Sequence, residues 1–133
     1  MNRDIFIVDD ARCVRYSLKL LLSKKGLHPM TFELPSVAMT SLSNRSDSPL
    51  LYLVDMRIPD ELDGSENLFD YVCQHDLSPE RFNFMTGHIS EHDQEVLRRT
   101  GASVFEKPFS SDWIITYIEE VISKLDNHYP SVL

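Results

Sequence analysis

Five polar residues in this sequence each stand at the end of a segment expected to be a β-strand. They are the carboxylates Asp9, Asp10 and Asp55, the hydroxyl of Thr86 and the ammonium of Lys107. Three carboxylates brought together repel one another unless a cation lies among them, and their oxygen atoms suit a hard ion such as Mg²⁺. A carboxylate can also attack phosphorus to give an aspartyl phosphate, and that reaction needs positive charge on the transferring oxygens. The five residues therefore fit Mg²⁺-dependent phosphoryl transfer to an aspartate, provided that the fold gathers them.

Apolar segments alternate with amphipathic segments along the chain. Short apolar runs predict strands, and apolar residues three or four positions apart predict helices that bury one face. The predicted strands are residues 5–8, 30–32, 50–54, 81–85 and 103–106. The predicted helices are residues 11–25, 35–42, 67–75, 90–100 and 111–125.

Residues that begin or end helices agree with these bounds. Gly26 is a plausible stop for the first helix, and Pro35 is well placed in the first turn of the second. Ser90 with Asp93 three residues later resembles a capping box, and Ser111 could cap the last helix. The helix boundaries are therefore supported by local chemistry as well as by periodicity.

Five strands alternating with five helices predict right-handed crossovers and a parallel sheet that is covered by helices on both faces. In such open sheets, sites form beyond the carboxyl ends of the strands, where the strand order reverses. The five polar residues all stand at ends of predicted strands. We therefore expect them to share one edge of the molecule.

Composition narrows the possible classes of protein. The 133 residues are the usual size of one domain, and 42% of them are hydrophobic, so a core can form. A net charge of −8 argues against direct, sequence-independent binding of nucleic acid, which needs a basic patch. The apolar runs are shorter than a membrane span, and the N-terminus does not resemble a signal peptide. We expect a cytoplasmic protein without membrane contact, in which Cys13 and Cys73 are buried free thiols.

Four short motifs at the predicted strand ends resemble the receiver domain of two-component response regulators, in order and approximate spacing over nearly the whole chain. The motifs are Val8-Asp9-Asp10, Leu53-Val54-Asp55 with Pro59 four residues later, Met85-Thr86-Gly87 and Lys107-Pro108-Phe109. The resemblance implies a flavodoxin-like, doubly wound fold with five parallel strands in the order 2-1-3-4-5. It also implies that residues 1–125 form the receiver domain and that residues 126–133 are a tail or the start of a linker.

The resemblance also implies a role for each site residue. Asp55 corresponds to the phosphoacceptor, and Asp10 and Asp55 would bind Mg²⁺ directly, together with the backbone carbonyl of Arg57. Asp9 would contact the ion through a water molecule. Lys107 would pair with the phosphoryl group. By the same resemblance, Thr86 corresponds to the switch hydroxyl, and the bond between Lys107 and the proline that follows it is expected to be cis.

The function implied by the resemblance is a phosphorylation-controlled signalling switch rather than a metabolic enzyme. A sensor histidine kinase or histidine phosphotransfer protein would supply the phosphoryl group, and a downstream output domain or protein would respond. Two alternatives remain open. One is a pseudo-receiver that binds partners but is never phosphorylated. The other is a Mg²⁺-dependent phosphohydrolase with an aspartate nucleophile, although Arg57 stands where such enzymes usually carry a second acid.

The chain departs from the family pattern at two places. Gly64 comes one residue later than usual, so that residues 59–64 form a longer segment beside the predicted site. The stretch before Lys107 is one residue shorter, and the place of the family's switch aromatic is therefore taken by Val104 or Phe105. We favour Val104, with Phe105 in the core, because a shift of one residue reverses the direction of a strand side chain.

Some residues have ordinary structural interpretations. Asp10 could cap the first helix, and the acids Glu61, Asp63 and Glu66 could form a solvated face. Trp113 and Tyr117, four residues apart on the last helix, either lie at the edge of the core or belong to a partner surface.

Overall fold

The computed structural model describes residues 2–128, which form five strands that alternate with five α-helices. The strands are β1 (Asp4–Val8), β2 (His28–Phe32), β3 (Leu51–Asp55), β4 (Phe82–Thr86) and β5 (Ser103–Glu106). The α-helices are α1 (Arg12–Ser23), α2 (Pro35–Ser43), α3 (Gly64–Gln74), α4 (Glu91–Thr100) and α5 (Ser111–His128). Two short 3₁₀ helices are η1 (Pro59–Glu61) and η2 (Pro79–Arg81).

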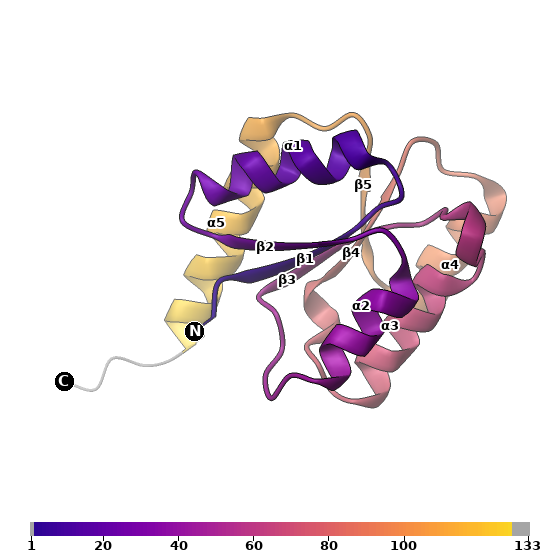
Figure 1. Ribbon diagram of the computed structural model, residues 1–133, viewed down its shortest axis with the longest axis horizontal. Coiled ribbons are helices and arrows are strands. Elements are labelled where there is room, and N and C mark those ends of the chain that lie inside the picture. Colours follow the sequence, from indigo (N-terminus) through magenta and orange to yellow (C-terminus); the bar gives the residue numbers. More distant parts are fainter. Residues whose placement is uncertain (1, 129–133) are drawn as a thin grey trace.

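All five strands are parallel and lie in the order β2-β1-β3-β4-β5, which confirms the predicted fold class. Helices α1 and α5 cover one face of the sheet, and α2, α3 and α4 cover the other (Figure 1). The strand order reverses between β1 and β3, so the carboxyl ends of these two strands open into the crevice where open sheets bind ligands.

Alternation along the strands divides the core into two layers. Phe6, Val8 and Val54 pack with α2, α3 and α4, whereas Ile5 and Ile7 pack with α1 and α5. The central strands β1 and β3 are almost completely buried because helices cover them on both faces. This double cover explains why their sequences are continuous apolar runs.

The ends of three helices refine the expectations from sequence. Asp10 does not cap α1, whose N-cap is Ala11 with no side-chain hydrogen bond; instead Asp9 Oδ1 accepts the Ala11 N–H at 2.9 Å. The capping box of Ser90 and Asp93 at the start of α4 is confirmed. The cap of α5 is Ser110 rather than the residue after it, because Ser110 Oγ accepts the N–H of Trp113 at 3.1 Å.

Helix α5 continues through His128, so the first three residues of the expected tail are helical. Residues 129–133, the rest of that tail, lie outside the described residues. The expected boundary at residue 125 stays a prediction.

The expectation of buried thiols is wrong. Cys13 and Cys73 are both free and both exposed. Each stands next to an inward-facing valine, Val14 on α1 and Val72 on α3, and neighbours along a helix point in different directions. Among residues 2–128, the helices are too short or too polar to cross a membrane.

A buried polar contact ties α5 to the middle of the sheet. The Tyr117 hydroxyl donates to Asn83 Oδ1 at 2.9 Å, and Asn83 is only 1% exposed. The Asn83 amide donates in turn to the backbone carbonyls of Tyr52 and Arg81, at 3.1 and 3.0 Å. Tyr117 and Trp113 also pack edge-on against Phe105, with ring centroids 5.0 and 4.6 Å away. Tyr117 belongs to the edge of the core, whereas the Trp113 residue is 47% exposed at the surface.

Tyr117→Phe is expected to lower the free energy of unfolding by about 1–3 kcal/mol, because it leaves Asn83 Oδ1 buried without a donor. Urea denaturation measures the loss. Tyr16→Phe on α1 is the matched control: Tyr16 is 62% exposed, and its change is expected to stay within about 0.5 kcal/mol. Equal stability of the two variants would contradict the structural role of the Tyr117 hydroxyl.

Candidate functional site

The carboxyl ends of β1, β3, β4 and β5 bring the predicted site residues to one edge of the sheet. Hydrogen bonds that continue the strand ladders fix the backbone there. The Asp9 N–H donates to the Phe32 carbonyl at 3.1 Å, and the Lys107 N–H donates to the Thr86 carbonyl at 2.7 Å. Oxygen atoms of Asp9, Asp10 and Asp55 lie within 4.8 Å of one another. The expectation that the three acids meet is therefore confirmed, and Lys107 reaches the same place.

Asp9 and Asp10 have different surroundings although they are adjacent. Asp9 is completely buried, and both of its carboxylate oxygens have a donor: the Ala11 N–H at Oδ1 and the Lys107 ammonium at Oδ2, 2.5 Å away. Arg15 also donates to the backbone carbonyl of Asp9 at 2.7 Å. Asp10 is exposed to solvent at the mouth of the site. Of these two carboxylates, that of Asp10 is the one open to an incoming ligand.

Asp55 is the last residue of β3 and is 8% exposed. Its Oδ1 accepts the N–H of Arg57 at 3.1 Å, and its Oδ2 lies 3.4 Å from the Lys107 ammonium. The hydroxyl of Ser65, a buried residue in the first turn of α3, donates to the Asp55 backbone carbonyl. The acid is therefore held from both sides while an edge of its carboxylate reaches the surface.

Burial raises the pKa of Asp55 to about 6, and the neighbouring Asp9 carboxylate adds to the rise, while the Arg57 N–H and the Lys107 ammonium oppose it. Partial burial alone would lower the pKa of Lys107, but its hydrogen bond to Asp9 and the charge of Asp55 raise it above the ordinary value. Lys107 is therefore charged at neutral pH. One ammonium faces three carboxylates, so negative charge is in excess at the site. The carboxylate oxygens can serve as ligands of a further cation, which would balance that charge.

Thr86 is 2% exposed at the end of β4. Its hydroxyl donates to the His88 carbonyl at 3.0 Å and accepts the His88 N–H at 3.4 Å. The hydroxyl is thus engaged with the loop that leads to α4. Turning toward Asp55 would require it to give up this bond.

Arg57, two residues after Asp55, extends toward α4. Its guanidinium Nη2 lies 2.6 Å from Asp93 Oδ2 and 3.3 Å from the His88 carbonyl oxygen. Although burial raises the pKa of the Asp93 carboxyl, hydrogen bonds from Ser90 and Arg57 outweigh it and hold the pKa below the usual value. Asp93 is therefore a charged, buried carboxylate.

The longer segment after Asp55 is anchored to α2. Both carboxylate oxygens of Glu61 accept hydrogen bonds from Ser36, one from its N–H at 2.9 Å and one from its hydroxyl. A Cβ at Gly64 would meet the Glu61 Cβ at 2.9 Å and the Pro35 Cγ at 3.0 Å, so the close packing of this segment needs a glycine. Glu61 thus serves as the cap that α2 lacks in its own sequence.

The acids of this segment were expected to form a solvated face, and for two of the three that expectation is wrong. Glu61 caps α2, and Glu66 pairs with Arg99 at 3.3 Å. Of these three acids, Asp63 alone is exposed. The hydrogen bonds of Glu61 and the ion pair of Glu66 join residues far apart in the chain, and the sequence carries no local sign of them.

Val104 and Phe105 point to opposite faces of the sheet. Val104 pairs in register with Phe84 and packs with the layer of α2, α3 and α4, whereas Phe105 is 3% exposed in the layer of α1 and α5. The expectation that Phe105 is a core residue is confirmed. An aliphatic side chain, rather than an aromatic one, therefore lies on the α4 side of β5. The Lys107–Pro108 bond is cis, as expected.

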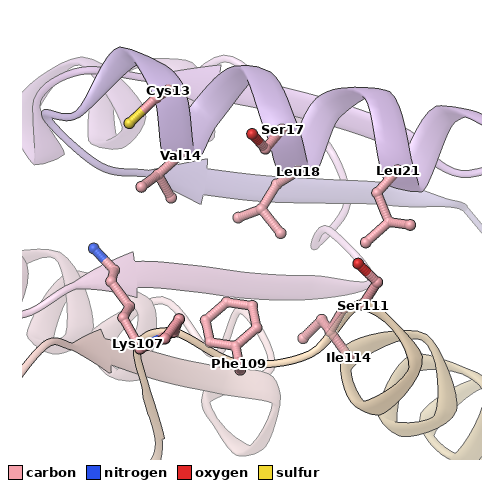
Figure 2. A pocket seen from close by; sticks show the side chains of 10 residues that line it. Cys13, Val14, Ser17, Leu18, Leu21, Lys107, Phe109, Ser111 and Ile114 are labelled. Carbon is pink, nitrogen blue, oxygen red and sulfur yellow. The ribbon is translucent and has the colours of Figure 1, made fainter.

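An apolar groove of about 330 Å³ borders the acidic site. It runs between α1 and the segment that joins β5 to α5. Figure 2 shows Val14, Leu18 and Leu21 of α1 pointing across it toward the segment that carries Phe109 and Ser111, with the Lys107 side chain at one end. Lys107 therefore belongs both to the acidic cluster and to the wall of this groove.

Sequence reasoning identified the residues of the acidic cluster but missed Ser65 and Asp93. Ser65 stands in a helix start with no motif of its own, so no signal could have identified it. Asp93 was recognised only as a cap; its ion pair joins residues 36 positions apart. The position of Arg57, two residues after Asp55 and therefore at the same edge of the sheet, is the single clue in the sequence to its ion pair with Asp93.

Comparisons with known proteins agree with this geometry. A model of the response regulator receiver domain matches residues 5–119. The comparison with curated proteins gives no match. Among solved structures, the chain is similar to the beryllofluoride-activated NtrC4 receiver domain dimer, with 26% identity, a TM-score of 0.74, and coverage of 92% of this chain and 98% of that chain.

Two further solved structures are similar. NtrX from Brucella abortus is 28% identical with a TM-score of 0.76, over 96% of this chain but only 29% of that chain. A CheY-like response regulator receiver domain protein from Methanospirillum hungatei JF-1 has a TM-score of 0.79 over 97% of this chain and 100% of that chain. Its identity of 23% supports the likeness of the fold alone.

Proposed function

Because the chain belongs to the response regulator receiver domain family, we propose that it is a signalling switch that accepts a phosphoryl group on Asp55. The observation that carries this proposal is the position of the Lys107 ammonium, 2.5 Å from Asp9 and 3.4 Å from Asp55, within a cluster of three carboxylates at one sheet edge. An aspartate that lies beside a fixed ammonium and a cation site has the surroundings that phosphoryl transfer needs.

The donor set of the cluster fits Mg²⁺. The ion prefers oxygen ligands and usually takes one or two carboxylates while it keeps several waters. Asp10 and Asp55 would bind it directly with the Arg57 backbone carbonyl, and Asp9, which is completely buried and has a donor on each oxygen, would act through a water. When bound, the ion supplies positive charge to the transferring phosphoryl oxygens.

In the proposed reaction a carboxylate oxygen of Asp55 attacks the phosphorus of a phosphohistidine on the partner. The bond from phosphorus to the histidine nitrogen breaks as the bond to Asp55 forms, and the imidazole leaves with the electron pair. Lys107 stabilises the charge on the phosphoryl oxygens through its fixed ammonium. Burial raises the pKa of Asp55 to about 6 in the ion-free protein, so its carboxylate is already ionised at neutral pH before a cation binds.

The phosphoryl group would then act as the signal. It adds close to two negative charges at the end of β3, beside the neighbouring strand β4, which ends at Thr86. The Thr86 hydroxyl would leave the His88 carbonyl and donate to a phosphoryl oxygen, which biases the arrangement of α4, β5 and α5.

The partners in this proposal are a sensor histidine kinase or histidine phosphotransfer protein as donor, and an output domain or protein as receiver of the signal. The domain promotes its own phosphorylation and dephosphorylation but has no metabolic substrate. Arg57, held by Asp93, occupies the place of a hydrolase's second acid, which disfavours the phosphohydrolase alternative. The cytoplasmic location stays a prediction from sequence.

Incubation with acetyl phosphate and Mg²⁺ is expected to add one phosphoryl group, measured as intact mass. Excess EDTA should prevent the adduct, because the cation that neutralises the transferring oxygens is then removed. A chain that stays unmodified with small donors and with histidine kinases would be a pseudo-receiver. Sustained release of phosphate from an aryl phosphate over many turnovers would instead favour the phosphohydrolase.

A further inference from the structure

A chain of hydrogen bonds connects the end of β3 to the start of α4. Arg57, two residues after Asp55, donates to Asp93 Oδ2 at 2.6 Å and to the His88 carbonyl at 3.3 Å. Asp93 Oδ2 also accepts the N–H of Ser90 at 3.0 Å, which closes the capping box of α4. A single carboxylate oxygen thus joins the loop of the proposed phosphoacceptor to the cap of the helix that the switch would move.

The proposed switch hydroxyl shares this network. Thr86 Oγ1 donates to the His88 carbonyl at 3.0 Å, the same oxygen that accepts from Arg57. When the Thr86 hydroxyl turns toward a phosphoryl group, the His88 carbonyl loses one of its two donors. The state of Thr86 is therefore coupled to the position of the Arg57 guanidinium.

The two partners of the ion pair differ in burial. The Asp93 side chain is 3% exposed, whereas the Arg57 side chain is 54% exposed. The buried carboxylate stays in place with the helix cap, and the arginine is the partner that can swing through solvent. A phosphoryl group with close to two negative charges is a stronger acceptor for a guanidinium than a carboxylate.

We propose that Arg57 and Asp93 form a latch that stabilises the unphosphorylated arrangement of α4, and that a phosphoryl group on Asp55 competes with Asp93 for the guanidinium. The inference rests on the proposed function and adds its regulation. It also gives α4 a link to the site that does not depend on an aromatic residue, since Val104 lies on the α4 side of β5. Release of the latch takes the charged partner from Asp93 and loosens the first turn of α4.

The latch predicts how a phosphoryl mimic binds. Beryllofluoride with Mg²⁺ is the probe, because it adds to a carboxylate in place of a phosphoryl group. Asp93→Asn removes the competing charge, so its apparent dissociation constant for beryllofluoride is expected to fall about three- to tenfold below that of the unmodified chain, the range for one charged hydrogen bond that is partly exposed. In the background of Arg57→Gln the same substitution should have no effect, because the latch is already open.

Ser90→Ala is the matched control. It removes the hydroxyl that caps the Asp93 N–H but leaves the ion pair with Arg57 intact. Its affinity for beryllofluoride should equal that of the unmodified chain. Equal tightening in Ser90→Ala and Asp93→Asn would show that any weakening of the cap favours binding, which overturns the latch.

The outcomes separate the inference from the function on which it rests. If the unmodified chain binds beryllofluoride and Asp93→Asn changes nothing, or acts equally in the Arg57→Gln background, the latch is wrong and the switch stands. If the unmodified chain binds no more beryllofluoride than Asp55→Asn does, the proposed function fails and the latch fails with it. Both are supported if Asp93→Asn lowers the dissociation constant for beryllofluoride threefold or more when Arg57 is present and leaves it unchanged in Arg57→Gln.

Discussion

Asp55→Asn is expected to abolish the phosphoryl adduct completely, the largest effect of any single change in this chain. The amide keeps the shape of the carboxylate and can still accept the Arg57 N–H, which lies 3.1 Å from Oδ1. It cannot serve as an anionic nucleophile toward phosphorus. Intact mass after incubation with acetyl phosphate and Mg²⁺ measures the loss.

The fold of this variant should be preserved, because burying an amide costs less than burying a carboxylate of raised pKa. Urea denaturation checks that point on the same sample. Asp60→Asn is the matched control: Asp60 is an exposed acid in η1 of the same loop, and its adduct should form normally. If the same fraction of Asp55→Asn carries a phosphoryl adduct as of the unmodified chain, the group lies on another residue and the assignment is overturned.

The fold could be predicted from sequence because burial on both faces leaves a strong local signature. The run from Ile5 to Val8 is apolar at every position, since alternate residues enter different layers of the core. The edge strand β2 contains Pro29 and partly exposed residues, so only its second half was predicted. Helix α3 begins three residues earlier than predicted, because η1 and Gly64 lead directly into it and the apolar pattern starts only at Leu68.

The acidic cluster could be predicted because parallel strands bring their carboxyl ends to one edge whatever the lengths of the connections. Contacts between side chains of different elements could not be predicted in this way. Glu61 capping α2 and Arg57 pairing with Asp93 depend on how loops fold back across the surface. Exposed acids and arginines are common in any sequence, so residue type alone does not distinguish a partner from a solvated side chain.

The structure also separates two acids that look equivalent in the sequence. Asp9 is buried with a donor on each oxygen, and Asp10 is exposed beside it. The first is part of the folded framework, and the second contributes charge repulsion that only a bound cation relieves. Functional sites commonly keep such local conflicts. Substitution of the two residues should therefore have opposite effects on stability.

Asp10→Ala is expected to weaken Mg²⁺ binding at least about tenfold while it raises the stability of the Mg²⁺-free protein, because a direct ligand and an unrelieved charge are lost together. Asp9→Ala should weaken Mg²⁺ binding less but lower the free energy of unfolding by about 3 kcal/mol, the low end for a broken buried ion pair. The low end applies because the Lys107 ammonium still has Asp55 Oδ2 as a partner 3.4 Å away when Asp9 is lost, and because the Lys107 side chain is 22% exposed to water.

Calorimetric titration with Mg²⁺ and urea denaturation with and without the ion measure the two quantities independently. Mg²⁺ should raise the denaturation midpoint of the unmodified chain and of Asp9→Ala, but hardly that of Asp10→Ala, because a ligand stabilises only the state that binds it. Equal losses of Mg²⁺ affinity in the two variants would show that the ion contacts both carboxylates alike. An unstable Asp10→Ala protein would show that its charge belongs to the framework as much as that of Asp9.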